Sequence, residues 1–423
     1  MKALAVIATV CALLVGACAT DDRSELEVRR EFDVSGVTVT DVFAPSDGDQ
    51  LPVVVMLHGT GGERDVMEPL AQAVAEEDVV VYLPSWPVID QVAPFPADDA
   101  EPYRRQAEAV VCALRFARRT AAEFGGDPDD ITVFGHSGGA TAAARAALVA
   151  TPPWPGIDCD PEVSHRPQRF IATGGDLLGE YQYSTECPDL FEPYNPMSIE
   201  PSNTDLEIRL IHGYYDTAVD ARVSQLFDHL ATSCGVDSAF VGTDTGHSEL
   251  RDPSSPAGAF VVEQVAALVH GRDSVFDRPA DGAVVQFAED GTCRYDGPPS
   301  MPLGEPLAIE FRNDTAGELH WFAMVRLRPE VPVTLDELRA DQTAIGDHPQ
   351  AFVSYGGYVS VPADATEELD WVVVDGDADW AVYRMRDPDP AHPMKRPGVV
   401  LWGGEALEAA AIISPAVGRD GLR

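Results

Sequence analysis

A serine, an aspartate and a histidine stand in this chain at positions where they could act together in nucleophilic catalysis. Ser137 lies within residues 135–139, which fit the pattern G-x-S-x-G. Asp216 and His247 follow it, each on a loop that leaves a predicted strand. A serine hydroxyl becomes a nucleophile when a histidine takes its proton and a carboxylate orients that histidine. The order serine, aspartate, histidine along the chain predicts that Ser137, Asp216 and His247 form such a triad.

The residues around Ser137 predict a strand, a sharp turn and a helix in that order. Residues 131–134 are a short apolar run, and residues 140–150 are small and suited to a helix. Flanking glycines permit a turn too tight for side chains, which lifts the serine hydroxyl clear of the sheet. The alternative interpretation is a glycine-rich connection that only packs the helix on the strand.

The acid of the triad has a rival. Asp216 follows the predicted strand 206–212, and Asp176 follows the predicted strand 169–173. Asp216 could instead serve only to stabilise a turn or cap the next helix. His247 could be an ordinary loop histidine, since the chain has ten. It is the one that follows both a serine and an acid, between a short strand and the last helix of the unit.

An upstream loop could stabilise negative charge. Residues 51–57 form a continuous apolar run, typical of a buried parallel strand, and the sequence HGTGG follows at 58–62. Charge that develops on a carbonyl oxygen needs preorganised donors. The backbone N–H groups of Gly138 and Thr60 are the predicted donors of this oxyanion hole. Alternatively, the glycines serve only the turns of the loop.

These motifs resemble those of the α/β-hydrolase superfamily, over residues 37 to about 270. They are similar to compact esterases of the dienelactone-hydrolase, polyhydroxybutyrate-depolymerase and feruloyl-esterase type. The resemblance implies ester hydrolysis through an acyl-enzyme, with Ser137, Asp216 and His247 as the triad. One departure is Gly138, where a residue with a side chain is commoner; another is the incomplete H-G-G-G run after His58. The matching stretches are 57–62, 126–139, 211–216 and 246–247.

Length and pattern predict two folded domains, because 423 residues exceed one ordinary core. Strands alternate with helices over 34–274, which predicts an α/β domain whose mostly parallel sheet has helices on both faces. Residues 275–423 show short alternating runs between turn residues and predict an accessory all-β sandwich. Residues 292–298 and 311–315 resemble cupredoxin-like domains of bacterial surface proteins.

No cofactor is predicted, and no metal. The chain has neither a C-x-x-C motif nor a Cys/His cluster, so a zinc site is not expected. His320 and Cys293 lack the clustered ligands that a copper site in the second domain would need.

The beginning of the chain predicts export. Residues 1–18 combine Lys2, a short apolar run and a lipobox that ends in Cys18, the pattern of a bacterial lipoprotein signal. Cys18 would carry the lipid, and residues 19–33 would be a tether at the membrane of the cell envelope. A plain secretory signal or an uncleaved anchor stays open, although the run is short for a membrane span.

An exported chain permits disulfides. Cys159 and Cys187 flank the predicted strand 169–173 and could bridge. The other cysteines beyond Cys18 are Cys112, Cys234 and Cys293, so one of the five is unpaired or pairs between chains.

The formal net charge of −41 argues against nucleic acid and anionic lipid head groups as partners. The expected partner is an ester, either a small molecule or a polymer. Alternatives are a peptidase or thioesterase on the same triad, or a binding lipoprotein that keeps the hydrolase fold without catalysis.

Overall fold

The structure is a computed structural model. It describes residues 25–60, 62–86, 101–148, 159–177, 205–278, 280–289, 292–298, 300–316, 320–327, 334, 336, 352–361, 363–374, 380–386 and 407–416. The predicted signal peptide with Cys18 lies outside these residues, and so does 399–402, one of the short runs from which the sandwich after residue 275 is predicted. No helix in the described ranges has both the length and the apolar run needed to cross a membrane.

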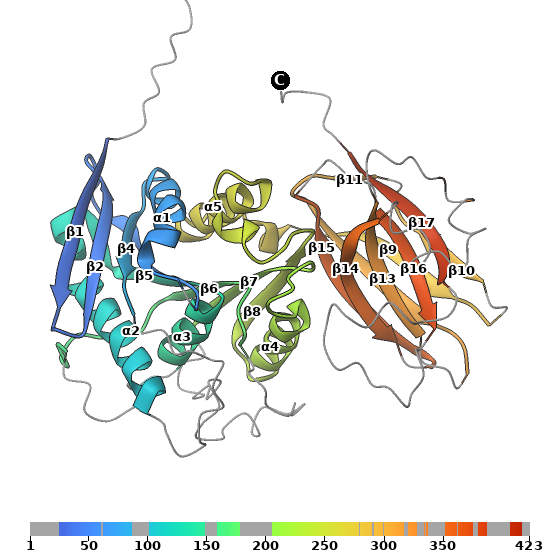
Figure 1. Ribbon diagram of the computed structural model, residues 1–423, viewed down its shortest axis with the longest axis horizontal. Coiled ribbons are helices and arrows are strands. Elements are labelled where there is room, and N and C mark those ends of the chain that lie inside the picture. The colour runs from blue at the N-terminus through green and yellow to red at the C-terminus, as the bar shows by residue number, and fades with distance from the viewer. Residues whose placement is uncertain are drawn as a thin grey trace, which may run out of the picture.

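A mostly parallel sheet is the centre of the first 270 residues (Figure 1). Its strands follow one another in the order β1-β2-β4-β3-β5-β6-β7-β8. β1 and β2 pair antiparallel, as do β2 and β4, and every later pair in this series is parallel. The strands are β1 (Leu26–Val34), β2 (Thr38–Pro45), β3 (Leu51–Leu57), β4 (Val80–Pro84), β5 (Gly126–His136), β6 (Arg169–Thr173), β7 (Glu207–Gly213) and β8 (Asp237–Thr243).

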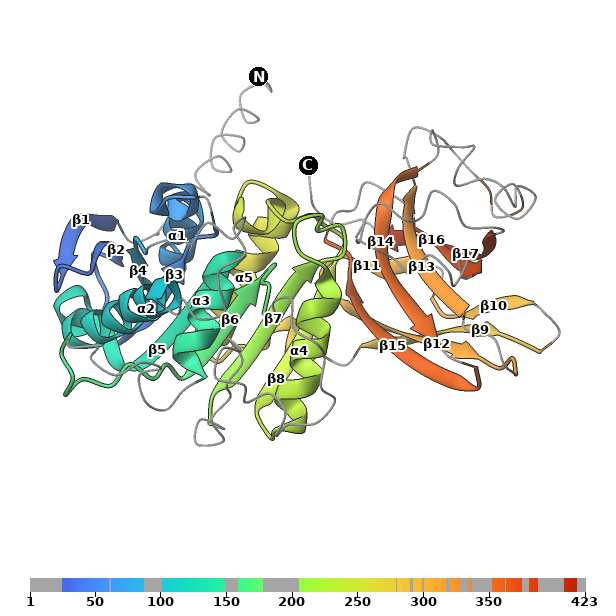
Figure 2. The same ribbon diagram turned by 60° about the horizontal axis from the view of Figure 1, so that its bottom comes forward.

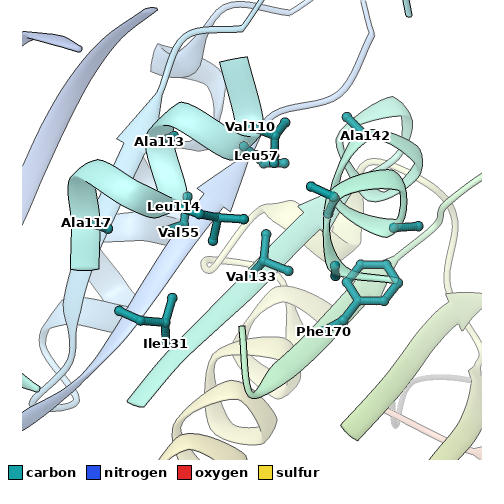
Figure 3. Packing of buried hydrophobic residues seen from close by; sticks show 14 of the residues in the cluster. Val55, Leu57, Val110, Ala113, Leu114, Ala117, Ile131, Val133, Ala142 and Phe170 are labelled. Atoms are coloured by element: carbon teal, nitrogen blue, oxygen red, sulfur yellow. The ribbon is translucent and has the colours of Figure 1, made fainter. Parts of the chain in front are cut away.

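Helices cover both faces of this sheet. One layer holds α2 (Glu101–Thr120), α3 (Gly138–Ala147) and α4 (Ala221–Ser233), and the other holds α1 (Glu68–Ala75) and α5 (Pro256–Val269). Alternate residues of a strand face opposite sides. In β3, Val53 and Val55 therefore join the core under α2 and α3, where Figure 3 shows Val55. Val54 and Met56 join the core under α1 and α5.

The fold is that of an α/β-hydrolase. The strand order and the two helical layers agree with the fold expected for residues 34–274, and every residue of β3 except Leu51 is buried, as the continuous apolar run predicts. The carboxyl ends of β3, β5, β7 and β8 come to one edge of the sheet. The predicted oxyanion loop, serine, acid and base follow these four strands in turn.

The structure differs from the expected tether at the start of the chain. β1 begins at Leu26, within the predicted tether 19–33, and pairs with β2. Most β1 side chains are exposed, and Glu27 and Arg29 pair with each other along the strand. The apolar residues of β1 do alternate, at positions 26, 28, 32 and 34, but the charged residues between them give the segment the composition of a linker.

The disulfide differs as well. Cys159 bonds to Cys112 of α2, with their Cα atoms 5.5 Å apart, so the suggested bridge from Cys159 to Cys187 is wrong. α2 packs over the segment that precedes β6, and Arg115 of the same helix donates to the Cys159 carbonyl at 2.9 Å. Packing of helix on loop therefore decides the pairing. Cys234 is also disulfide-bonded, and the Cys293 side chain is buried.

The strands after residue 280 form two sheets. β15, β12, β9 and β10 continue the central sheet beyond β8, and β11, β17, β16, β13 and β14 form the second sheet (Figure 2). The two-domain division at 274 stays a prediction, but the sheet itself crosses it. The strands are β9 (Asp281–Phe287), β10 (Cys293–Asp296), β11 (Ser300–Pro302), β12 (Pro306–Asn313), β13 (His320–Leu327), β14 (Phe352–Val361), β15 (Ala365–Val372), β16 (Trp380–Arg386) and β17 (Leu407–Ala416).

One acid on β15 should make stability depend on pH. Burial, with the charges of Glu368 and Asp228, raises the pKa of Asp370 to about 6. The folded protein therefore holds this proton more tightly than the unfolded chain, and stability falls as pH rises from about 4 to about 6. We expect Asp370→Asn to stabilise the protein at pH 8 by about 1 kcal/mol, after a discount for partial exposure. Denaturant unfolding at pH 4 and pH 8 measures this.

The gain should vanish at pH 4, where the wild-type carboxyl is already neutral. Asp47→Asn, in the exposed turn after β2, is the matched control and should change stability at neither pH. An equal gain at both pH values for Asp370→Asn would mean that the carboxyl charge is not its source.

Candidate active site

Ser137 occupies the turn between β5 and α3. β5 ends at His136 and α3 begins at Gly138, so the serine alone makes the connection. Its backbone has φ 55° and ψ −127°, a conformation that residues with a side chain rarely adopt. The Ser137 N–H donates to the Thr173 carbonyl of β6 at 2.9 Å, which holds the turn against the sheet. A strained serine at a strand-to-helix turn is the geometry of a nucleophile elbow.

Asp216 and His247 meet beyond the ends of β7 and β8. His247 Nδ1 donates to Asp216 Oδ2 at 2.5 Å, and the Asp216 side chain is fully buried. The other carboxylate oxygen accepts the N–H groups of Ala218 and Val219, both at 2.8 Å. The carboxylate is thus fixed by its own loop, and it in turn fixes the imidazole.

A second histidine also donates to this carboxylate. His212 Nε2 lies 3.1 Å from Asp216 Oδ2, and His212 Nδ1 lies 2.7 Å from Ser224 Oγ on α4. A carboxylate only accepts, so His212 must carry its hydrogen on Nε2 toward Asp216. Its Nδ1 forms the second hydrogen bond, with the Ser224 hydroxyl. The tautomer is assigned from these partners.

These donors outweigh the cost of burying a charge. Burial by itself would raise the pKa of the Asp216 carboxyl. The hydrogen bonds from His212 and His247, with the N–H of Val219, instead hold that pKa well below its usual range. Asp216 is therefore ionised at neutral pH, as an acid that orients a histidine must be.

Two further residues pack against the His247 ring. The His136 ring lies 4.7 Å from it, and His136 Nδ1 is 3.0 Å from Thr173 Oγ1. Burial, and then the nearby charges of His247 and Arg251, lower the pKa of His136 to about 3, so His136 remains neutral and does not compete as a base. A Cβ on Gly174, whose φ is +56°, would lie 3.1 Å from His247 Nδ1, so only glycine leaves room for the acid–base pair.

The loop after β3 lies against the turn of Ser137. A Cβ on Gly59 would come 3.0 Å from the Ser137 Cβ. A Cβ on Gly138 would overlap Thr60 Oγ1 and lie 3.2 Å from Thr60 N. The backbone of Thr60 therefore approaches the first residue of α3, whose N–H has no partner within the helix. This approach explains why position 138 is glycine rather than a residue with a side chain.

The two candidate acids have different contacts. His247 Nδ1 contacts Asp216, whereas the Asp176 carbonyl accepts the Thr141 hydroxyl at 2.7 Å and serves α3. Ser137 Oγ and His247, both within the described part, are not joined by a hydrogen bond; such bonds often tighten only when substrate binds. Among described residues, no three His, Cys, Asp or Glu side chains gather as a metal site would require.

Sequence reasoning missed three residues of this site, namely His136, His212 and Gly174. His136 fills a variable position of G-x-S-x-G, and His212 precedes a glycine at the end of β7. Both positions end a buried parallel strand, where a polar side chain is uncommon. The available signal in the sequence was therefore a histidine at the end of an apolar run. For Gly174, the signal was the Gly-Gly pair directly after β6.

Comparisons with known proteins found partial matches to this chain. The model of the Carboxylesterase family matches residues 110–153, which contain the Ser137 turn. Carboxylesterase NlhH of Mycobacterium tuberculosis is 34% identical over 122 residues, 28% of this chain and 35% of that protein. Glutactin of Drosophila melanogaster is 30% identical over 200 residues, 44% of this chain and 18% of that protein. The chain spans about a third or less of the length of these relatives.

Two solved structures are similar to part of this chain. An esterase of the planctomycete Thermogutta terrifontis, with propionate bound, matches 60% of this chain and 96% of its own, at 19% identity and a TM-score of 0.45. An esterase of Pyrobaculum calidifontis matches 58% of this chain and 85% of its own, at 21% identity and a TM-score of 0.44.

Proposed function

We propose that this protein is a serine hydrolase that cleaves carboxylic esters through an acyl-enzyme. The observation that carries the proposal is the Asp216–His247 hydrogen bond beside the strained turn of Ser137. A fixed carboxylate, an oriented imidazole and a serine on a sharp turn are together what acyl transfer requires. The match to the Carboxylesterase family over residues 110–153 supports esters as substrates over thioesters and amides.

The proposed reaction has two halves. Ser137 Oγ attacks the ester carbonyl, and His247 takes the hydroxyl proton at Nε2, because Nδ1 is held by Asp216. The oxyanion forms against the N–H groups of Gly138 and Thr60. His247 returns the proton to the leaving alcohol, which leaves the acyl group on Ser137. Water then attacks the acyl-enzyme with the same base, and the acid and Ser137 are released.

Two experiments test this function. A fluorophosphonate probe should label wild-type protein, since it reacts with an activated serine; a binding lipoprotein without catalysis would not be labelled. Rates on matched acetyl esters, thioesters and anilides should then rank the ester first. A higher rate on the thioester or the anilide would instead support a thioesterase or a peptidase. Acetyl, feruloyl and polyester substrates extend the panel to the proposed subfamily of small esterases.

We also propose that the protein is exported and anchored by lipid on Cys18, with the cupredoxin-like strands after residue 275 as an accessory module. The lipobox at residues 14–18 supports the anchor. Growth with a palmitate analogue should label the wild-type chain and not Cys18→Ser. The Cys18→Ser variant should no longer be found in the membrane fraction. Equal labelling of the two chains would refute the anchor at this residue.

The His212 donor should matter for turnover. His212→Leu removes one of the two histidine donors on Asp216 Oδ2, so the carboxylate holds His247 less firmly. A hydrogen bond to a charged group contributes about 1.5–3 kcal/mol, so we expect kcat on p-nitrophenyl acetate to fall about tenfold or more, with KM nearly unchanged. Ser224→Ala, which leaves His212 in place, should have a smaller effect of the same kind. A larger loss from Ser224→Ala would contradict this order.

A further inference from the structure

β8, the strand that precedes the loop of His247, is not an edge strand in this protein. β15 pairs parallel to β8, with Trp371 opposite Gly242 and Val372 opposite Thr243 (Figure 2). Thr243 is the last residue of β8 and lies four residues before His247. β15 therefore contacts the sheet at the point where the loop of the base begins.

A buried carboxylate joins this loop to the added strand. Asp244 is fully buried, and its Oδ1 accepts the N–H of Val374, two residues beyond β15, at 2.8 Å. Asp244 stands three residues before His247, so a shift of its side chain would move the loop that carries the imidazole. A hydrogen bond to a buried carboxylate is among the stronger polar contacts in proteins.

The loop of the acid is fastened to the same strand. The Tyr214 ring stacks on Trp371 at 5.0 Å and 18°, and its hydroxyl donates to the Asp370 carbonyl at 2.8 Å. Burial, with the charge of Asp370, raises the pKa of Tyr214 well above its ordinary value, so the hydroxyl remains a donor. Tyr214 stands two residues before Asp216. Gly242 is required beside it, because a Cβ there would overlap the tyrosine ring.

Backbone hydrogen bonds make the two loops one unit. The Tyr214 N–H donates to the Thr243 carbonyl at 2.8 Å, and the Tyr215 N–H donates to the Thr245 carbonyl at 2.9 Å. Thr243 Oγ1 and Thr245 Oγ1 lie 2.9 Å apart. A support that fixes one loop on its outer side therefore fixes the other as well.

We propose that Asp244 and Tyr214 are positioning residues, through which β15 holds the base and the acid in register for catalysis. The strands after residue 280 thus help to position the catalytic residues, in addition to forming the accessory module. This inference rests on the proposed ester hydrolysis, and it adds a role for a part of the chain that the triad does not include.

Substitutions in the full-length chain test the proposal. Asp244→Ala removes the acceptor for Val374, and we expect kcat on p-nitrophenyl acetate to fall about tenfold, with KM changed less than about twofold. Fluorophosphonate labelling should slow by a similar factor. Asp244→Asn keeps an oxygen that can accept the same N–H, so it should restore most of the rate.

Gln225→Ala is the matched control. Gln225 Nε2 donates to the Glu368 carbonyl at 3.2 Å, so it joins the same strand to α4 away from both loops. We expect it to leave kcat at the wild-type value, whatever it does to stability. A wild-type kcat in folded Asp244→Ala would overturn the role of Asp244. An equal loss of kcat in Gln225→Ala would overturn the positioning role, because it would mean that β15 supports the fold in general rather than the two catalytic loops.

Tyr214→Phe keeps the proposal testable if Asp244→Ala does not fold. It removes one buried hydroxyl and leaves the ring stacked on Trp371, so we expect about a threefold lower kcat and an unchanged KM. An unchanged kcat would overturn the role of Tyr214. Wild-type protein that hydrolyses no ester would refute the proposed function itself, which is a different outcome from either variant result.

Discussion

Ser137→Ala is expected to abolish ester hydrolysis while leaving the protein folded. The substitution removes only the hydroxyl oxygen, and with it the atom that forms the acyl-enzyme. Loss of a nucleophilic serine in a triad lowers kcat by about a millionfold in a well-studied case, so we expect a loss of at least about a thousandfold here. The remaining rate would come from direct attack of water on the ester, with the oxyanion donors stabilising the transition state. Hydrolysis of p-nitrophenyl acetate under steady-state conditions measures the loss.

The fold should survive this change for a local reason. Position 137 has a positive φ, which alanine and serine tolerate about equally. The Ser137 N–H bond to the Thr173 carbonyl is a backbone contact and does not depend on the side chain. Circular dichroism and the melting temperature should therefore match those of the wild type. A rate near the wild-type value in folded Ser137→Ala would remove this serine from the mechanism.

Ser248→Ala is the matched control for that experiment. Ser248 is exposed, lies next to His247, and its side chain caps no helix. We expect the wild-type rate and no loss of fluorophosphonate labelling. Loss of labelling in this variant would mean that the probe reacts with Ser248, and the roles of the two serines would have to be exchanged.

The fold of the first 270 residues could be predicted because its signals are local. A buried strand such as β3 is a continuous apolar run, and helices between such runs bring parallel strands together. Chain order then places Ser137, Asp216 and His247 at the carboxyl edge of one sheet. The contact that favours Asp216 over Asp176 as the acid is not local. It needed the loop geometry that brings His247 Nδ1 to one of them.

Contacts between distant residues could not be predicted in the same way. The pairing of Trp371 with Gly242 joins residues more than 120 positions apart, and no local pattern encodes it. A glycine within a strand marks a close approach of some kind, but it does not identify the neighbour. The Cys112–Cys159 disulfide has the same character, because packing of α2 against a loop decides it. Spacing along the chain carries no information on such packing.

Asp216→Asn is expected to lower kcat by about a thousandfold or more, in the range seen when the acid of a serine triad is replaced. The carboxylate accepts four hydrogens, from His247 and His212 on Oδ2 and from Ala218 and Val219 on Oδ1. An amide offers one acceptor oxygen and one donor nitrogen. In either orientation of the amide, its nitrogen, which is itself a donor, therefore faces either the two histidines or the two backbone N–H groups. If that pair is the histidines, His247 loses the tautomer that places a free Nε2 toward the serine.

Stability should change with a defined dependence on pH. The hydrogen bonds hold the pKa of Asp216 below its usual range, so its contribution to stability is present above pH 4 and is lost as pH falls further. Asp216→Asn should thus be less stable than the wild type at pH 7, and the gap should narrow in acid. Denaturant unfolding at several pH values measures the gap.

Asp176→Asn separates the two candidate acids. Asp176 meets α3 through its backbone carbonyl, which the substitution keeps, so we expect most of the wild-type kcat. The contrast between the two asparagine variants is the decisive quantity. A thousandfold loss in Asp176→Asn together with a small loss in Asp216→Asn would move the acid to the loop after β6, and His247 would then have to turn away from Asp216 during the reaction.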